Sequence, residues 1–281
     1  TAQEDSLFQY TIAADAFSDS DVGDTLTYSA EQVGGAALPV WLTFDGATGE
    51  FSGTATNDEV GTIDIEVTAT DGAGETATDS FTVTVANTND APVVDAGIND
   101  LPILEDFAFT YAIAADAFSD SDVGDTLTYT ATLAGGGALP AWLDLTGSDF
   151  SGTATNDDVG IYTIEVTATD GSGATATDSF DLEIVNVNDA PVVDAGISDL
   201  DITDGVAVNF TVPADAFNDV DGDTLTYSAE LSGGGALPAW LSFDEATQVF
   251  SGTPTAADEG TIIAVGVTDG EFSATTDFTL I

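Results

Sequence analysis

The stretch DAFSDSDVGDTLTYSA at residues 15–30 holds the two features that decide this fold, a cluster of acidic residues and the beginning of an alternating strand. It returns as DAFSDSDVGDTLTYTA at residues 116–131 and as DAFNDVDGDTLTYSA at residues 215–229. The copies begin 101 and 99 residues apart, which is too long for a solenoid unit and close to the length of an immunoglobulin-like sandwich. We therefore expect one domain per copy.

Three shorter motifs recur in the same order in every copy. The LPxWL motif begins at residues 38, 139 and 237, the FSGT motif begins at residues 51, 150 and 250, and the TDG motif ends at Gly72, Gly171 and Gly270. These motifs predict three repeats, at residues 1–90, 91–189 and 190–281. The first repeat is expected to lack its beginning and the third its end, so we interpret the chain as a piece of a longer protein.

The hydrophobic pattern within a copy has a period of two, which is typical of strands with one buried face. Apolar Leu127, Tyr129, Ala131 and Leu133 alternate with threonines. The same alternation runs through Tyr162, Ile164, Val166 and Ala168, and through Phe180, Leu182 and Ile184. No segment keeps a helical period, and glycine clusters separate the strands. The pattern predicts an all-β fold.

The composition excludes several classes of function. The chain has 51 Asp and Glu residues, no Lys, Arg or His, and a formal net charge of −51. Such a chain repels nucleic acid and anionic lipid, and it has no apolar run of the roughly 20 residues that cross a bilayer. Without His or Lys the Ser, Thr and Tyr hydroxyls have no activating base, and no carboxylate pair suits a glycosidase, so we do not expect an enzyme.

The clustered acidic residues need a counter-charge from outside the polypeptide. Two carboxylates about 5 Å apart repel each other by about 3 kcal/mol at an effective dielectric constant near 20. Because the chain has no Cys and no His, only oxygen ligands remain, and these select hard cations, above all Ca²⁺. Turn-capping Asp residues and a solvated acidic surface are the alternatives.

The repeats meet at two similar connectors, NTNDAPVVDAGI at residues 87–98 and NVNDAPVVDAGI at residues 186–197. Pro92 and Pro191 restrict the backbone and lack an amide donor. These connectors are therefore expected to be short and stiff rather than flexible tethers.

Taken together, the D-x-D cluster before DTLTY, the LPxWL and FSGT pair, the ATDG turn and the N-x-NDAP junction resemble the cadherin-like repeats of the dystroglycan type, found in bacterial and archaeal surface proteins and adhesins. The resemblance covers the whole chain. It implies three tandem seven-stranded Greek-key β-sandwiches of the cadherin and immunoglobulin type, arranged head to tail. It also implies Ca²⁺ bound between successive repeats.

The resemblance further implies one set of ligands at each junction. The first set is Glu4, Glu59, Asn87, Asn89, Asp90, Asp120, Asp122 and Asp170. The second set is Glu105, Asp158, Asn186, Asn188, Asp189, Asp219, Asp221 and Asp269. Cadherins usually begin the connector with Asp, whereas this chain has Asn87 and Asn186, which implies one fewer charge and weaker binding at each site.

Incomplete sites are expected at the two ends of the array. Asp19, Asp21 and Asp71 of the first repeat are expected to face a preceding domain. Asp204 and Glu259 of the third repeat are expected to face a following domain.

The tryptophan of each LPxWL motif, at Trp41, Trp142 and Trp240, has two interpretations. Exposed aromatic rings hold sugars in many carbohydrate-binding proteins. A sandwich of this size also needs a large aromatic side chain in its core, and we expect the core position.

We therefore expect a calcium-stiffened extender segment of a large extracellular adhesin or surface fibre. A carbohydrate-binding array and a subunit of a self-assembling filament or sheath are the alternatives. The expected partners are the neighbouring repeats of the same chain, with copies of the chain itself or cell-surface glycans as further candidates. The expected location is the cell surface or the extracellular space, without direct membrane insertion.

Overall fold

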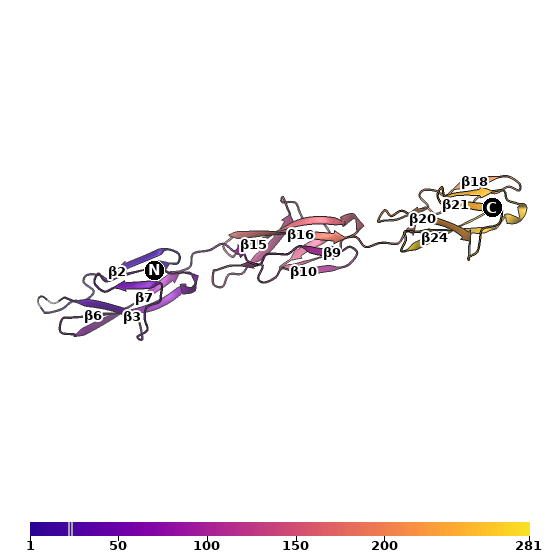
Figure 1. Cartoon of the computed structure of the whole chain (residues 1–281). Coiled ribbons are helices and arrows are strands. Elements are labelled where there is room, and N and C mark those ends of the chain that lie inside the picture. Colours follow the sequence, from indigo (N-terminus) through magenta and orange to yellow (C-terminus); the bar gives the residue numbers. More distant parts are fainter. Residues whose placement is uncertain (22, 24) are drawn as a thin grey trace. The chain divides into compact units, whose positions relative to one another are not determined.

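The computed structural model describes residues 1–21, 23 and 25–281, and the regular structure in this part of the chain is almost entirely β-strand (Figure 1). It divides into two compact units. One holds residues 1–100, 110–151 and 163–181, and the other holds residues 101–109, 152–162 and 182–281. The division passes through the second repeat. Each connector with the acidic loops around it therefore lies within a single unit.

The first repeat is a sandwich of two sheets. Its elements are β1 (Ala2–Gln3), β2 (Leu7–Thr11), β3 (Thr27–Gln32), β4 (Leu42–Asp45), β5 (Glu50–Thr54), the 3-10 helix η1 (Asn57–Glu59), β6 (Gly61–Thr70) and β7 (Thr76–Ala86). The strand orders are β1-β7-β6-β3 and β2-β5-β4. Phe51, Ile65 and Val67 lie in the core between the sheets.

The second repeat contains strands at the corresponding positions and, in addition, the short strands β8 and β11, which pair with each other. They are β8 (Val93–Val94), β9 (Leu101–Leu104), β10 (Phe109–Ala112), β11 (Phe118–Ser119), β12 (Thr128–Leu133), β13 (Leu143–Thr146), β14 (Asp149–Gly152), η2 (Asn156–Asp158), β15 (Gly160–Thr169) and β16 (Thr175–Val185). β12 pairs antiparallel with β15, and β9 pairs parallel with β16. The predicted alternation is confirmed, because Ile164, Val166 and Ala168 are fully buried.

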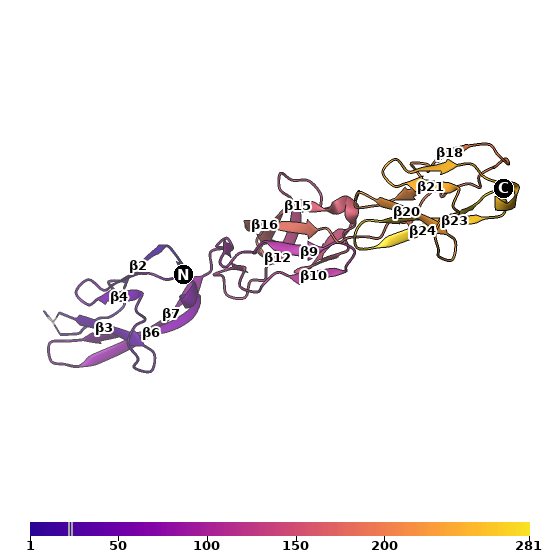
Figure 2. The same ribbon diagram turned by 45° about the vertical axis from the view of Figure 1, so that its right-hand side comes forward.

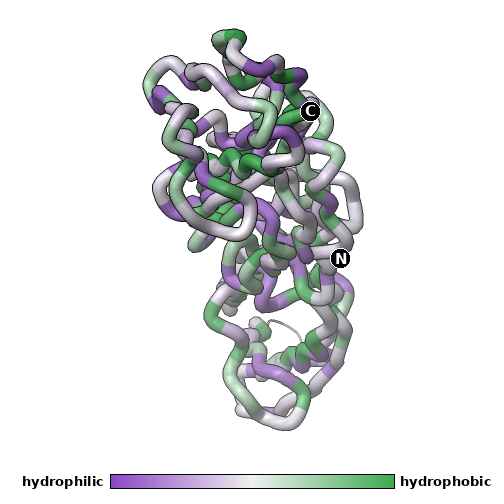
Figure 3. Tube along the Cα trace, turned by 90° about the vertical axis from the view of Figure 1, so that its right-hand side faces the viewer, coloured by the Kyte–Doolittle hydropathy of each residue, from purple (hydrophilic) through white to green (hydrophobic). Residues whose placement is uncertain are grey.

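The third repeat lies within one unit, and Figure 2 shows its two layers, with β18 and β21 on one side and β20, β23 and β24 on the other. Its elements are β17 (Val192–Val193), β18 (Val208–Thr211), β19 (Phe217–Asn218), β20 (Thr226–Leu231), β21 (Leu241–Asp244), β22 (Val249–Gly252), η3 (Ala256–Asp258), β23 (Ile262–Thr268) and β24 (Ser273–Thr279). An isolated bridge from Leu200 to Leu280 stands where β9 pairs with β16 in the second repeat. Figure 3 shows hydrophilic and hydrophobic residues alternating over short distances along the chain.

The FSGT and LPxWL motifs recur together because their backbones touch. Gly53 of β5 pairs with Leu42 of β4, and a Cβ atom at Gly53 would lie 1.7 Å from the carbonyl oxygen of Trp41. At Gly252 the distance from such a Cβ to the carbonyl oxygen of Trp240 would be 1.9 Å. Only glycine fits at these positions. The preceding phenylalanines, Phe51 and Phe250, are almost fully buried.

The predicted all-β fold of three tandem sandwich-type repeats is confirmed. Of the residues that the structure describes, none forms a helix long and apolar enough to span a membrane.

Candidate functional site

Hydrogen bonds hold the first connector against the acidic loops of the second repeat, including one from the Ser121 hydroxyl to Oδ2 of Asp90 over 3.1 Å. The main-chain N–H of Asp90 donates to Oδ2 of Asp122 over 2.9 Å, and Nδ2 of Asn89 donates to Oδ2 of Asp170 over 2.8 Å. From the first repeat, Nδ2 of Asn57 donates to Oδ2 of Asp90 over 2.7 Å. The structure therefore brings together predicted residues from the connector and from two loops of the second repeat.

Three carboxylates of the D-x-D loop form the acidic centre of this junction. Asp120, Asp122 and Asp125 each place an oxygen within 4.8 Å of the others. The loop is kept tight by a 2.9 Å hydrogen bond from the main-chain N–H of Asp122 to Oδ1 of Asp120. Asp122 is only 6% exposed, so its charge is poorly solvated.

Several buried carboxylate oxygens in this junction have no hydrogen-bond partner among the described residues. They are Oε2 of Glu4, Oδ2 of Asp120 and Oδ1 of Asp122. Glu4 is completely buried, and its other oxygen accepts a hydrogen bond from the main-chain N–H of Thr88 in the connector. Burying a charged oxygen without a partner is costly, and this chain has no Lys, Arg or His to pair with it.

The second junction repeats most of these contacts, but Asn156 donates to the D-x-D loop where its counterpart Asn57 donates to the connector. The main-chain N–H of Asp189 donates to Oδ2 of Asp221 over 2.6 Å, and Nδ2 of Asn188 donates to Oδ2 of Asp269 over 3.1 Å. Nδ2 of Asn156 donates to Oδ1 of Asp221 over 2.8 Å. The D-x-D loop is closed by a 3.0 Å hydrogen bond from the N–H of Asp221 to Oδ1 of Asp219.

Glu105 is the counterpart of Glu4 at the second junction. It is completely buried, its Oε1 accepts a 2.8 Å hydrogen bond from the N–H of Val187, and its Oε2 has no partner among the described residues. Burial raises the pKa of the Glu105 carboxyl, and the nearby charges of Asp106, Asp221 and Asp189 raise it further. The site therefore disfavours an unpaired negative charge here.

The pKa values of the aspartates in the TDG turns are lowered, in contrast to that of Glu105. The side-chain amide of Asn89 lowers the pKa of Asp170, and the N–H groups of residues 172–174 lower it further. At Asp269, burial raises the pKa, but hydrogen bonds from Glu271, Phe272 and Asn188 outweigh burial and lower it. Both turns thus hold a charged carboxylate beside a connector.

Of the predicted ligands, two cap short helices, and two make no side-chain hydrogen bond among the described residues. Glu59 and Asp158 accept hydrogen bonds from Thr56 and Thr155 and cap the short helices η1 and η2. Asn87 and Asn186 are exposed, and among the described residues their side chains make no hydrogen bond.

The incomplete sites also differ from one another. Asp19, Asp21 and Asp71 line one hollow of about 250 Å³ on the first repeat, and the N–H of Asp21 donates to Oδ1 of Asp19 over 2.7 Å. In the third repeat Asp204 is exposed. Asp258, the residue before Glu259, accepts hydrogen bonds from Thr255 and is the counterpart of Glu59 and Asp158 in the third repeat.

The junctions also contain residues that were not among the predicted ligands. Asn57 and Asn156 reach acidic residues of the connector and of the next repeat, and Asp125 joins the D-x-D loop. A signal was present, because Asn57 and Asn156 stand directly after the recurring FSGTAT motif and Asp125 begins DTLTY. The residue equivalent to Asp125 in the first repeat, Asp24, lies outside the described residues.

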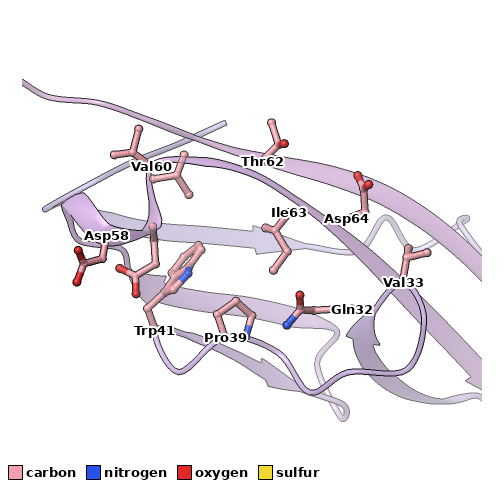
Figure 4. A pocket seen from close by; sticks show the side chains of 11 residues that line it. Gln32, Val33, Pro39, Trp41, Asp58, Val60, Thr62, Ile63 and Asp64 are labelled. Carbon is pink, nitrogen blue, oxygen red and sulfur yellow. The ribbon is translucent and has the colours of Figure 1, made fainter. Parts of the chain in front are cut away.

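Trp41 and Trp240 of the recurring LPxWL motif are half-buried and pack on the cores of their repeats, as predicted, and Trp142 is also half-buried. Trp41 also lines an open hollow of about 500 Å³ (Figure 4). Figure 4 shows Gln32 and Pro39 on the same side as Trp41, with Ile63 and Asp64 opposite. Polar groups beside an aromatic ring are compatible with a small polar ligand such as a sugar.

The junction residues fit a hard divalent cation. Their side chains offer only oxygen atoms for coordination, several of these oxygens are buried without partners, and they come from separate loops. Ca²⁺ accepts six to eight oxygen ligands in irregular geometry, whereas Mg²⁺ requires a stricter octahedron.

Comparisons with known proteins agree with this fold. A family model described as "Putative Ig domain" matches residues 1–86, 91–185 and 190–281. Over 149 residues the chain is 32% identical to the "Serine-rich adhesin for platelets" of Staphylococcus aureus strain USA300, a match covering 52% of this chain and 6% of the adhesin. This chain therefore spans only a small part of that relative.

Solved cadherin structures share the fold. The structure of human CDH23 EC21-23 has a TM-score of 0.59 and 19% identity, covering 91% of this chain and 88% of that chain. The structure of mouse Cadherin-23 EC22-24 has a TM-score of 0.51 and 18% identity, covering 91% of this chain and 86% of that chain.

Proposed function

Because this chain belongs to the "Putative Ig domain" family and carries three tandem copies of the domain, we propose that it is a calcium-stiffened segment of an extracellular adhesin or surface fibre. In this proposal Ca²⁺ binds at each junction between repeats. The repeat boundaries proposed here follow residues 90 and 189.

One observation supports this proposal most strongly. At both junctions, carboxylate oxygens are buried without a partner among the described residues, namely those of Glu4, Asp120 and Asp122 at the first and of Glu105 and Asp219 at the second. A chain without cationic side chains cannot neutralise these groups itself. A bound divalent cation would supply the missing positive charge.

The chain's own residues would hold the cation and fix the junction. At the first junction we assign Glu4, Asp120, Asp122 and Asp170 as the main ligands, with Asn89 and Asp90 from the connector. At the second junction we assign Glu105, Asp219, Asp221 and Asp269, with Asn188 and Asp189 from the connector. Without the cation, carboxylates on both sides of the connector repel one another and the junction loosens.

Glu59, Asp158, Asn87 and Asn186 remain proposed outer ligands. The first repeat would complete a further site from Asp19, Asp21 and Asp71 when a preceding domain supplies the rest. Neighbouring repeats of the same chain are the proposed partners, and a cell-surface or extracellular location is proposed from the adhesin relative.

Calcium titration of three proteins tests the proposal. Isothermal calorimetry and small-angle scattering would be recorded for the unchanged chain, for Asp122→Asn and for the control Asp149→Asn, whose carboxylate is exposed on β14. We expect calcium to narrow the range of conformations that small-angle scattering reports for the unchanged chain and for the control. Asp122→Asn should lose one binding event. Scattering curves that are identical with calcium and with chelator would contradict the proposal.

A second function has a specific observation in its favour. The hollow beside Trp41 combines an aromatic side chain with Gln32 and Asp64, which suits a sugar ring with several hydroxyl groups. A glycan array with the unchanged chain and with Trp41→Ala would test it, with Trp240→Ala as the matched control. Loss of binding only in Trp41→Ala would support the carbohydrate-binding alternative.

A further inference from the structure

The open hollow beside Trp41 lies at a position where the first repeat differs from the other two. The main-chain N–H of Gln32 donates to the carbonyl oxygen of Ala36 over 2.8 Å. Leu133 and Leu231 make the equivalent main-chain hydrogen bonds in the second and third repeats, over 2.8 and 3.0 Å. Gln32 therefore stands where both other repeats have leucine.

The side chain at this position contributes to filling or opening the hollow. In the third repeat, Leu231 packs on the hydrophobic core together with Trp240. In the first repeat, Nε2 of Gln32 instead donates to the carbonyl oxygen of Ala37 over 2.6 Å. Oε1 of Gln32 accepts no hydrogen bond from the described residues. A polar side chain thus replaces an apolar one beside Trp41, where about 500 Å³ is open.

A second difference places a carboxylate on the strand that lines the hollow. Oγ1 of Thr82 on β7 donates to Oδ1 of Asp64 on β6 over 2.6 Å. The second repeat has the same pair with the residue types reversed, because Oγ1 of Thr163 on β15 donates to Oδ1 of Asp181 on β16 over 2.7 Å. The acidic residue therefore lines the hollow in the first repeat and lies one strand further away in the second.

All the charged side chains that line the hollow are negative. Figure 4 shows Asp58 beside Trp41 at one end and Asp64 near Val33 at the other, and Glu59 lines the hollow as well. The chain has no Lys, Arg or His to balance these charges, so the hollow attracts cations and repels phosphate, sulfate and acidic sugars. The face of an aromatic ring attracts a positive charge too.

We propose that this hollow binds an amino sugar whose amine is free and positively charged. The inference rests on the carbohydrate-binding function proposed for Trp41 and specifies the class of sugar. The sugar ring would lie against Trp41, Oε1 of Gln32 would accept a hydroxyl hydrogen, and the ammonium group would pair with a carboxylate at one end of the hollow. An N-acetylated sugar would leave these carboxylates without a counter-charge.

The size and chemistry of the hollow favour a sugar ring over a lysine side chain. A volume of about 500 Å³ lies within the range of pockets that hold small molecules. A lysine side chain is flexible and carries a compact, strongly hydrated charge. A ring with several hydroxyl groups and an ammonium group offers many hydrogen-bond donors, which match the carboxylate and amide oxygens of the lining.

Isothermal calorimetry with two trisaccharides tests the inference in the full chain. One is a trimer of glucosamine with free amines, and the other is the corresponding trimer of N-acetylglucosamine. Calcium is kept in excess so that it competes with the sugar amines at the acidic junctions. We expect one glucosamine trimer to bind per chain, and the N-acetylated trimer to bind about tenfold more weakly or less.

Two pairs of variants separate the hollow from the general negative charge of the chain. Gln32→Leu changes no charge and introduces the residue of the other repeats, so it should fold and weaken glucosamine binding about tenfold or more. Its control, Gln9→Leu at an exposed position of β2, should bind normally. Asp64→Asn should weaken binding about threefold, whereas the exposed Asp149→Asn should not.

NMR of the tryptophan indole N–H signals locates the bound sugar. A glucosamine-induced shift of the Trp41 signal, assigned with Trp41→Phe, would support the hollow. Equal shifts of the Trp142 or Trp240 signals would overturn it. Binding that Gln32→Leu leaves unchanged would also overturn it, because the sugar would then be attracted only to the acidic surface.

The remaining outcomes distinguish this inference from carbohydrate binding in general. Equal affinity for both trimers, lost in Gln32→Leu, would overturn the requirement for a charged amine and leave carbohydrate binding supported. Trilysine that binds as tightly as the glucosamine trimer and is lost in Gln32→Leu would mean that the hollow takes a basic peptide, which would overturn the sugar. Absence of glucosamine binding would overturn the inference, and the glycan array decides separately whether Trp41 binds another sugar.

Discussion

The main-chain N–H of Asp90 lies 2.9 Å from Oδ2 of Asp122 and donates a hydrogen bond to it. The same contact joins Asp189 to Asp221 over 2.6 Å at the second junction. A main-chain donor cannot rotate away, so these bonds set the register of each connector on the next repeat. In the proposed function, calcium would neutralise the carboxylates around these bonds and so keep them from being broken by charge repulsion.

The pKa of Asp170 should depend on Asn89 and not on Asn87. Asn89 donates to the Asp170 carboxylate and is the main cause of its lowered pKa, whereas Asn87 is exposed. In Asn89→Ala without calcium, the pKa of Asp170 should rise towards its ordinary value of 3.8. Carboxyl NMR titration measures this shift. Asn87→Ala is the control, and an equal shift in both variants would contradict the geometry.

Replacement of Glu105 by Gln should have opposite effects on stability with and without calcium. Gln keeps the acceptor for the Val187 N–H and removes a buried charge whose Oε2 has no described partner. An unsatisfied buried polar group costs about 1–3 kcal/mol and a charged one costs more, so Glu105→Gln should raise the unfolding temperature in chelator. In calcium it should lower that temperature relative to the unchanged chain, because one ligand loses its charge.

Differential scanning calorimetry of Glu105→Gln and of the unchanged chain, with calcium and with chelator, measures both changes in unfolding temperature. At a calcium concentration 100 times the dissociation constant, binding stabilises the unchanged chain by about 2.7 kcal/mol. Asp149→Asn should keep this gain. A lower unfolding temperature of Glu105→Gln in both conditions would refute the idea that Glu105 is an uncompensated charge.

Without calcium, Glu105 should make the chain more stable at mildly acidic pH than at neutral pH. Its folded pKa is raised above the ordinary value of 4.5, so the folded state binds the proton more tightly than the unfolded state. This stabilisation is complete below the ordinary value and is lost as the pH rises through the folded pKa. Asp170 acts in the opposite sense. Its pKa is lowered in the folded state, so its contribution to stability is present above the ordinary value of 3.8 and is lost as the pH falls through the folded pKa.

Urea unfolding in chelator, measured at several pH values between 4 and 7, checks the Glu105 contribution. We expect the free energy of unfolding to fall more with rising pH in the unchanged chain than in Glu105→Gln. Equal slopes would show that Glu105 does not titrate differently on folding.

The alternating pattern was sufficient to predict the buried faces of the strands. Ile164, Val166 and Ala168 are fully buried because a period of two places them on one face of β15. The acidic loops could be predicted from the repeats, since Asp122 and Asp170 recur in fixed motifs. The buried faces and the acidic loops can be predicted from short stretches of sequence, because each strand and turn is determined mainly by residues that are neighbours in the chain.

The contacts of Asn57 could not be predicted in this way. Asn57 meets Asp90, 33 residues away, only after the helix η1 and the connector have packed together. Glu259 is a different case, because the segment after the FSGT motif has the same length in every repeat, and counting from this motif already places Asp258 rather than Glu259 at the capping position.

Substitution of Gly53 by Ala should destabilise the first repeat, although an extended strand position would normally accept Ala. The added Cβ would lie 1.7 Å from the Trp41 carbonyl oxygen, and backbone cannot move aside as a flexible side chain can. β4 and β5 must then separate, at a cost of at least about 1–3 kcal/mol. The strand pair that carries Leu42 and Phe51 into the core should open first.

Hydrogen exchange can resolve this effect because the third repeat serves as an internal reference. In Gly53→Ala the amides of β4 and β5 should exchange faster, while those of β21 and β22 should stay protected. Gly137→Ala is the matched control, because its Cβ would meet only the Leu133 side chain at 3.6 Å. Unchanged protection of β4 and β5 in Gly53→Ala would mean that the FSGT glycine is not required for the close approach to the LPxWL backbone.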